Sequence, residues 1–170
     1  MRAFLQFVDG SRLGLEGSCK EAGYVSWVVI KEIVHTIAQP ISGAVGSGVT
    51  YDPNPASGMP PTAGRGEHGP FIVRKDLDKI SPKIAAFCSA GNKLGQIKVD
   101  VKFNPSAGTS VDYTSGTMKY TLDNCYCTRV HCQGDPLIEE LHFVYDKISW
   151  TYHDDAPEGA GQNMEAAWDL

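Results

Sequence analysis

FIVRKDLDKISPKIAAFCSAGNKLG, residues 71–95, contains the clearest helix signal in the chain and lies between two β-rich halves. Ser81 stands where an N-cap belongs, and Pro82 suits the first turn, where its missing amide would have no partner. Three apolar residues follow at i, i+3 and i+4 spacing and share one face: Ile84, Phe87 and Cys88. Gly91 supplies the left-handed residue that ends a helix. The stretch predicts a short helix with one apolar stripe, which is typical of a helix lying on a sheet.

The residues on both sides of this helix follow the two-residue period of strands. Phe71–Val73 predicts a short strand, and the charged run 74–79 predicts a surface turn. Apolar residues alternate over 96–103, and a further strand is predicted over 117–130, with one face formed by Met118, Tyr120, Leu122, Tyr126 and Val130. Farther on, the apolar phase changes between Asp146 and Lys147. Because the strand period is two, this change predicts a bulge or bend.

Residues 24–37, YVSWVVIKEIVHTI, form the most apolar segment and permit two interpretations. Trp27, Ile30, Val34 and Ile37 would form a helical stripe, whereas the many β-branched residues favour a strand. We choose the strand, which would be apolar on both faces. Such a strand must be covered on both sides, so the helix or a neighbouring subunit is expected to cover the second face.

Long alternating strands with one short helix predict an all-β fold, a barrel or sandwich with a helix on its flank. At 170 residues the chain is expected to form a single domain, 1–170, beginning with a strand over 3–8 and a loop over 11–23. The long Gly/Pro-rich loop 39–70 is either a linker or a binding loop that orders against a partner. The acidic C-terminal tail 153–170 is expected to be solvated, with Trp168 as an anchor.

Composition excludes several classes of function. The net charge of −5 argues against a nucleic-acid-binding protein, which would usually show a basic face. The N-terminus lacks the apolar run of a Sec signal peptide, and no stretch approaches the 18 apolar residues of a membrane span, so no membrane insertion is expected. Five cysteines, an odd number at irregular spacings, fit folding in a reducing cytoplasm better than a disulfide framework.

One group of residues has the composition of a metal site: Cys125, Cys127, His131 and Cys132. Four such ligands could hold zinc. Zinc ligand pairs normally lie on tight turns, however, and Cys125 and Cys127 fall on the polar side of a predicted strand, which favours free thiols. Elsewhere the histidines are scattered and no phosphate-binding loop is present. The sequence therefore predicts a binding or structural protein without cofactor, not an enzyme.

Several motifs resemble the haemolysin-coregulated protein (Hcp) family of bacterial type VI secretion. The matching residues of the W-I…H…Q-P run are Trp27, His35, Gln39 and Pro40, with Val28 for isoleucine. The F-x-x-x-K-x-x-D-K-x-S-P-x-L block is matched by Phe71, Lys75, Asp78, Lys79, Ser81 and Pro82, with Ile84 for leucine and Gly91 following. The F-x-Y-x-K-I-x-W-x-Y strand is matched by Phe143, Tyr145, Lys147, Ile148, Trp150 and Tyr152, and the tail motif by Trp168-Asp169-Leu170. The order Glu16-Gly17-Ser18, the longer loop and the cysteine group depart from the family.

The resemblance implies a β-barrel of two sheets with one flanking helix, assembled as a homo-hexameric ring. Such rings stack into the inner tube of the type VI system, inside contractile sheath proteins and below a tip spike protein. The lumen would carry small effector proteins. The subunit would be assembled in the bacterial cytoplasm and secreted without a Sec signal. Two alternatives remain open, an effector-binding chaperone or export receptor and a phage-like tail tube subunit.

Overall fold

The computed structural model describes residues 2–39, 66–103, 116–154 and 163–170. The chain divides into two compact units, one formed by Met1–Val34 with Pro70–Leu170 and the other by His35–Gly69. The helices and strands are β1 (Arg2–Phe7), α1 (Gly10–Leu13), β2 (Val28–Ile30), β3 (Glu32–Val34), β4 (Ile37–Ala38), β5 (Glu67–His68), β6 (Phe71–Asp76), α2 (Ser81–Ala90), β7 (Lys93–Phe103), β8 (Gly116–Gln133), β9 (Ile138–Val144), β10 (Lys147–Asp154) and β11 (Met164–Asp169).

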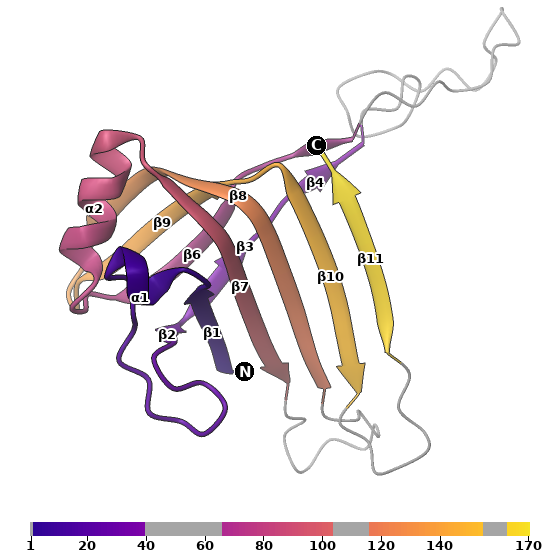
Figure 1. Cartoon of the computed structure of the whole chain (residues 1–170), viewed down its shortest axis with the longest axis horizontal. Coiled ribbons are helices and arrows are strands. Elements are labelled where there is room, and N and C mark those ends of the chain that lie inside the picture. Colours follow the sequence, from indigo (N-terminus) through magenta and orange to yellow (C-terminus); the bar gives the residue numbers. More distant parts are fainter. Residues whose placement is uncertain (1, 40–65, 104–115, 155–162) are drawn as a thin grey trace, which may run out of the picture. The chain divides into compact units, whose positions relative to one another are not determined.

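The larger unit is built on one branched antiparallel sheet (Figure 1). Its nine described strands follow the path β2-β1-β7-β8-β9-β6-β3, and β10 and β11 branch from β8. The prediction of a mainly β fold with a short flanking helix is confirmed, but the prediction of a barrel of two sheets is corrected, because these nine strands form one sheet without barrel closure. The physical reason is the length of β8, whose first half pairs with β10 and whose second half pairs with β9. One strand thus joins the two layers that the sequence suggested would be separate.

The bend in β8 lies at Asn124, which adopts a positive φ of 56°. Leu122 faces the core before this residue, whereas Cys125 and Cys127 face it afterwards, with exposed fractions of 0% and 4%. The prediction that the two cysteines lie on the polar side of the strand is wrong, because the left-handed residue shifts the inward phase by one position. The predicted bend between Asp146 and Lys147 is confirmed, since β9 ends just before it and β10 begins there.

Residues 24–37 do not form the single strand that was predicted. The segment changes partner at Lys31, whose amide donates to the carbonyl of Arg74 at 2.8 Å, so that β2 pairs with β1 and β3 with β6. Val28 and Ile30 are buried in the core, while Val29 is 55% exposed. One apolar face is therefore covered by the sheet, and the other is open within this unit. The short helix α1 was also not predicted.

The helix predicted in the quoted stretch is confirmed as α2, which packs against β8. Ile84 is fully buried, and Phe87 and Cys88 pack against the core. Gly91 ends the helix with a φ of 64°. The N-cap is Ile80 and not Ser81, because the Ser81 hydroxyl is engaged with buried charges instead of with the first turn.

The smaller unit contains a two-stranded sheet in which Ile37 pairs with His68 and Ala38 with Glu67. The rings of His35 and His68 have centroids 5.9 Å apart. Burial, and then the nearby His68, lower the pKa of His35 below 6.5. Most of the predicted loop 39–70, including Pro40, lies outside the described residues.

Candidate functional site

A buried charged cluster lies where β6 meets the start of α2. Lys75 is 1% exposed, although its run of charges predicted a surface turn. Its Nζ lies 2.7 Å from an oxygen of Glu139 on β9 and 2.8 Å from Asp78 Oδ1. It also donates to the Ser81 hydroxyl at 3.0 Å. The surface prediction is wrong for Lys75, because the carboxylate of its cross-strand partner Glu139 neutralises it inside the core.

The remaining bonds of this cluster fix the turn that leads into α2. Ser81 Oγ donates to Glu139 at 2.8 Å and accepts the Asp78 amide at 3.1 Å. Asp78 Oδ1 accepts the amide of Ile80 at 3.1 Å. Every polar atom of these side chains that is fully buried has a partner. A cluster satisfied in this way holds structure together and offers no reactive group.

A second charged network lies on the outer side of β6 and β9. Glu140 accepts a hydrogen bond from Arg74 Nε at 2.8 Å, and its other oxygen lies 2.8 Å from His142 Nε2. Arg74 also bonds Glu32 on β3 at 2.8 Å. The hydrogen bonds from His142 and then Arg74 lower the pKa of Glu140 from 4.5 to about 2.

The Glu140→Gln variant should be less stable than the parent protein by about 1 kcal/mol at neutral pH, a modest value because Arg74 is partly exposed. A carboxylate whose folded pKa is depressed stabilises the protein above its unfolded pKa. The difference should therefore persist above pH about 4.5 and disappear as the pH falls toward about 2. Urea unfolding of both proteins across this range measures it, and a difference that does not change with pH would contradict the assignment.

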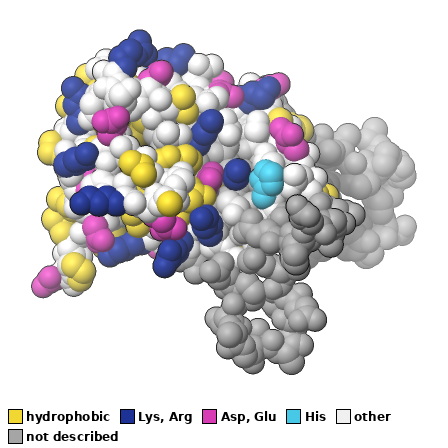
Figure 2. Space-filling view, turned by 60° about the horizontal axis from the view of Figure 1, so that its bottom comes forward, with side chains coloured by type: hydrophobic (Ala, Val, Ile, Leu, Met, Phe, Trp, Pro, Cys, Tyr) yellow, Lys and Arg dark blue, Asp and Glu magenta, His cyan; other side chains and the backbone are white. Residues whose placement is uncertain are grey.

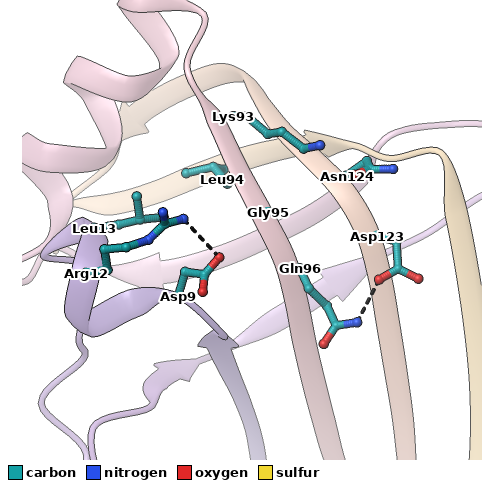
Figure 3. A pocket seen from close by; sticks show the side chains of 9 residues that line it. All are labelled: Asp9, Arg12, Leu13, Lys93, Leu94, Gly95, Gln96, Asp123 and Asn124. Carbon is teal, nitrogen blue, oxygen red and sulfur yellow. Dashed lines mark hydrogen bonds and ion pairs between the residues drawn. The ribbon is translucent and has the colours of Figure 1, made fainter.

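The pocket drawn in Figure 3 lies between α1 and the bend of β8 and has a volume of about 360 Å³. In its wall Arg12 pairs with Asp9 at 3.4 Å, and Gln96 Nε2 donates to Asp123 at 2.7 Å. The nine lining residues include no Cys, His, Ser or Tyr. The wall therefore has no Cys–His or Ser–His pair for nucleophilic catalysis.

The apolar inner face of the sheet becomes exposed toward β11. Cross-strand partners run from Val101 through Met118 and Tyr152 to Met164. The exposed fraction along this row rises from 4% at Val101 to 70% at Met164. Another row on the same face leads through Ile148 to Trp168, which is 46% exposed. The core surface thus continues onto a strand that no other described element covers.

The strand β11 also ends the branch of the sheet, beyond β10 (Figure 1). Met164, Ala166 and Trp168 occupy its apolar face, while Glu165, Ala167 and Asp169 occupy the opposite face. Among the described strands only β10 pairs with it, so its outer backbone edge can pair with another strand. We call this apolar face together with the outer edge the β11 surface. It is the candidate functional site, and it suits association with a protein.

On one face of the molecule the surface charge is mixed (Figure 2). On the face shown in Figure 2, Lys and Arg side chains are interspersed with Asp and Glu side chains. Within the described ranges, no helix has the length and hydrophobicity needed to cross a membrane.

The residues predicted as functional do not meet in one site. Trp27 packs edge-on against Tyr24, in the segment before β2. On the other branch of the sheet, Lys147 pairs with Asp169 on β11. Trp150 is the cross-strand partner of Ala166 on β11. Lys79 and Pro82 are exposed beside the buried cluster. Sequence reasoning missed Met164 and Ala166, although the alternation of MEAAWD could have indicated a strand.

The residues considered as zinc ligands are also separated. The thiols of Cys125 and Cys127 donate to the carbonyls of Leu122 and Arg129, and His131 contacts Gln133. Cys132 is exposed. Within the part of the chain that the structure describes, no three His, Cys, Asp or Glu side chains are grouped to hold a metal ion.

Comparison with known proteins agrees with the fold. The family described as "Type VI secretion system effector, Hcp" matches residues 4–152. The "Major exported protein" of Pseudomonas aeruginosa is 27% identical over 113 residues, which cover 63% of this chain and 64% of that relative. The chain thus matches less than two thirds of the length of this curated relative.

Solved structures show the same mainly β fold with a flanking helix. A type VI secretion system effector from Yersinia pestis has a TM-score of 0.65 at 16% identity, covering 99% of both chains. A type six secretion system protein has a TM-score of 0.72 at 14% identity, covering 99% of this chain and 95% of the other. Hcp1 from E. coli EAEC 042 has a TM-score of 0.63 at 21% identity, covering 98% and 97%. At these identities the likeness shows the fold alone.

Proposed function

This chain belongs to the Hcp family of type VI secretion proteins, and on this premise we propose that it is a structural subunit of the secretion tube. It is an exported, non-enzymatic protein of that system. Six copies form a ring, and rings stack into a tube inside the contractile sheath and below the tip spike. Small effector proteins occupy the lumen of the tube.

The observation that carries this proposal is the β11 surface. It combines an apolar face, on which Met164 is 70% exposed, with an open strand edge. Exposed apolar surface continuous with a core marks an interaction site. A ring requires a head-to-tail contact between two different surfaces of the same protein. Val25 and Val29, which are 64% and 55% exposed, provide apolar residues for the second surface.

Two lysine substitutions on β11 test the contact with a matched control. Ala166 lies on the apolar face opposite Trp150, whereas Ala167 lies on the polar face opposite Ser149. We expect Ala166→Lys to convert rings to monomers, because it places a charge in a dry contact, while Ala167→Lys leaves rings intact. Native mass spectrometry measures the assembly, and thermal unfolding confirms that both variants are folded.

Equal assembly of the two folded variants would exclude the β11 apolar face as the contact. A parent protein that stays monomeric at high concentration would contradict the ring itself. In cells, deletion of the protein should abolish export of all effectors. Loss of one effector alone would indicate a cargo chaperone instead of a tube subunit.

A further inference from the structure

The segment between α1 and β2, residues 14–27, has a tip that is held on the sheet by one buried side chain (Figure 1). We call this segment the strap. It folds back on itself, because the Gly17 amide donates to the carbonyl of Ser26 at 2.8 Å and the Ser26 amide donates to the carbonyl of Cys19 at 3.0 Å. At its tip, residues 20–26, Tyr24 is buried and the other residues are exposed or half-buried. The contacts of Tyr24 therefore decide whether the tip lies on the sheet.

Tyr24 occupies a site built by β1 and β7. Its ring stacks on Phe4 of β1 with centroids 4.1 Å apart, and Lys102 Nζ of β7 lies 4.6 Å from its ring centroid. Its hydroxyl donates to Asp100 Oδ2 at 3.2 Å. Asp100 is the cross-strand partner of Phe4, and its neighbours along β7 are buried in the core, so it lies on the outer face of the sheet. It is nevertheless only 8% exposed, and opening of the strap would give its carboxyl group access to water.

The charges that face Asp100 come from β7 and β8. Lys98 and Lys102 flank it on β7, and Lys119 is its cross-strand partner on β8. Burial raises the pKa of Asp100 above 3.8, although Lys119, the Tyr24 hydroxyl and the two flanking lysines act in the opposite direction. Desolvation disfavours the ionised form of a carboxyl group. The closed strap therefore favours the protonated form of Asp100 more than an open strap would.

A second attachment of the tip responds to acid in the opposite direction. Glu21 pairs with Arg2 at 3.3 Å and with Lys102 at 4.0 Å, and all three side chains are partly exposed. Protonation of Glu21 would weaken these pairs and loosen the tip. The direction in which the strap responds to pH thus distinguishes Asp100 from Glu21.

We propose that Tyr24 and Asp100 form a latch that is closed by acid, in which a proton on Asp100 holds the tip of the strap on the sheet and its loss favours opening. In the open state water solvates the carboxylate, and its pKa returns toward the ordinary value. The closed state then binds more protons than the open state. Closure is therefore favoured as the pH falls through the raised pKa, and the gain is complete below about 3.8.

The latch also bears on ring assembly, because Val25 directly follows Tyr24 and is 64% exposed. The proposed function places Val25 in the second surface of the ring contact. Closure of the strap would fix the position of this side chain, so mild acid should strengthen the rings. This last step rests on the proposed function, whereas the latch itself acts within one subunit.

Hydrogen exchange of the full-length protein from about pH 7 to about pH 4, corrected for the intrinsic effect of pH, tests the latch. The amides of Tyr24, Ser26 and Trp27 donate within the strap, and their protection factors should rise severalfold toward the acidic end. Asp100→Asn keeps an oxygen acceptor for the Tyr24 hydroxyl but cannot ionise, so it should remove this rise. Tyr24→Phe keeps the ring and loses the hydroxyl, so it should lower protection at both ends of the range. The amides of α2 serve as the internal control and should not respond to either substitution.

Three results would overturn the proposal. They are a strap whose protection is constant or falls toward acid, a rise that persists unchanged in Asp100→Asn, and a rise that is seen in the parent protein but not in Ala166→Lys. The last variant is expected to be monomeric, so it separates closure of the latch from coverage by a neighbouring subunit. If Asp100→Asn does not fold, NMR titration of the Asp100 carboxyl carbon decides, and a pKa at or below 3.8 contradicts the latch. Absence of rings together with an intact response of the strap would contradict the ring and leave the latch standing.

Discussion

Replacement of Lys75 by methionine is expected to lower the free energy of unfolding by about 3–5 kcal/mol. Lys75 is 1% exposed and lies 2.7 Å from Glu139, whose side chain is 2% exposed. The substitution leaves Glu139 as a buried carboxylate that keeps, among the described side chains, the hydrogen bond from the Ser81 hydroxyl. A buried charge that loses its counter-ion must be desolvated without compensation. Equilibrium unfolding in urea measures the loss.

Lys79 provides the control for this experiment. It lies four residues away, carries the same charge and is exposed. Lys79→Met should therefore change stability by less than about 0.5 kcal/mol. Adding Glu139→Gln to Lys75→Met should recover part of the loss, because it removes the unpaired charge. If Lys75→Met and Lys79→Met were equally stable, Lys75 would not be buried as the structure shows.

The contrast between these lysines shows how far the sequence could be interpreted. The helix that follows them was predictable because Pro82 and Gly91 act locally at its two ends. The burial of Lys75 was not, since it depends on Glu139, which lies on β9 far along the chain. A run of charged residues looks the same in sequence whether its partner is water or a distant carboxylate.

The strand β8 illustrates a second limit. Alternation correctly predicted a strand and placed Leu122 inward, but the pattern fails after Asn124. Asn is one of the few residues that readily adopts a positive φ, so a bend at Asn124 was permitted by the sequence but not required. Only the change of partner from β10 to β9 requires the bend there, and this is a tertiary effect.

The candidate site was predicted least well. The acidic composition of residues 153–170 suggested a solvated tail, and the family motif marked Trp168 without giving its role. In the structure Met164–Asp169 form β11, and all six of these residues are exposed. A short strand that is fully exposed in one protomer gives a weak periodic signal, because nothing within the same chain selects for its pattern.

Gly17→Ala is expected to cost about 3 kcal/mol or more, although it adds only one methyl group. A Cβ at this position would overlap the carbonyl of Trp27 and lie 2.6 Å from the amide nitrogen of Val28. These are backbone atoms, so the clash cannot be relieved by turning a side chain. The Gly17 amide donates to the carbonyl of Ser26 at 2.8 Å, and this hydrogen bond holds the backbone at Gly17 close to the backbone just before β2.

Displacement of the Trp27 and Val28 backbone by this clash would disturb the start of β2. Trp27 packs edge-on against Tyr24 with ring centroids 5.1 Å apart, and Tyr24 stacks on Phe4 at 4.1 Å. Gly23→Ala is the matched control, because Gly23 has a φ of 85° but no atom within 4 Å of a new Cβ. It should cost only about 1 kcal/mol of backbone strain. Urea unfolding compares the free energies of unfolding of the two variants. If Gly17→Ala lowered this free energy less than Gly23→Ala, the backbone around Gly17 would be able to move without disturbing β2.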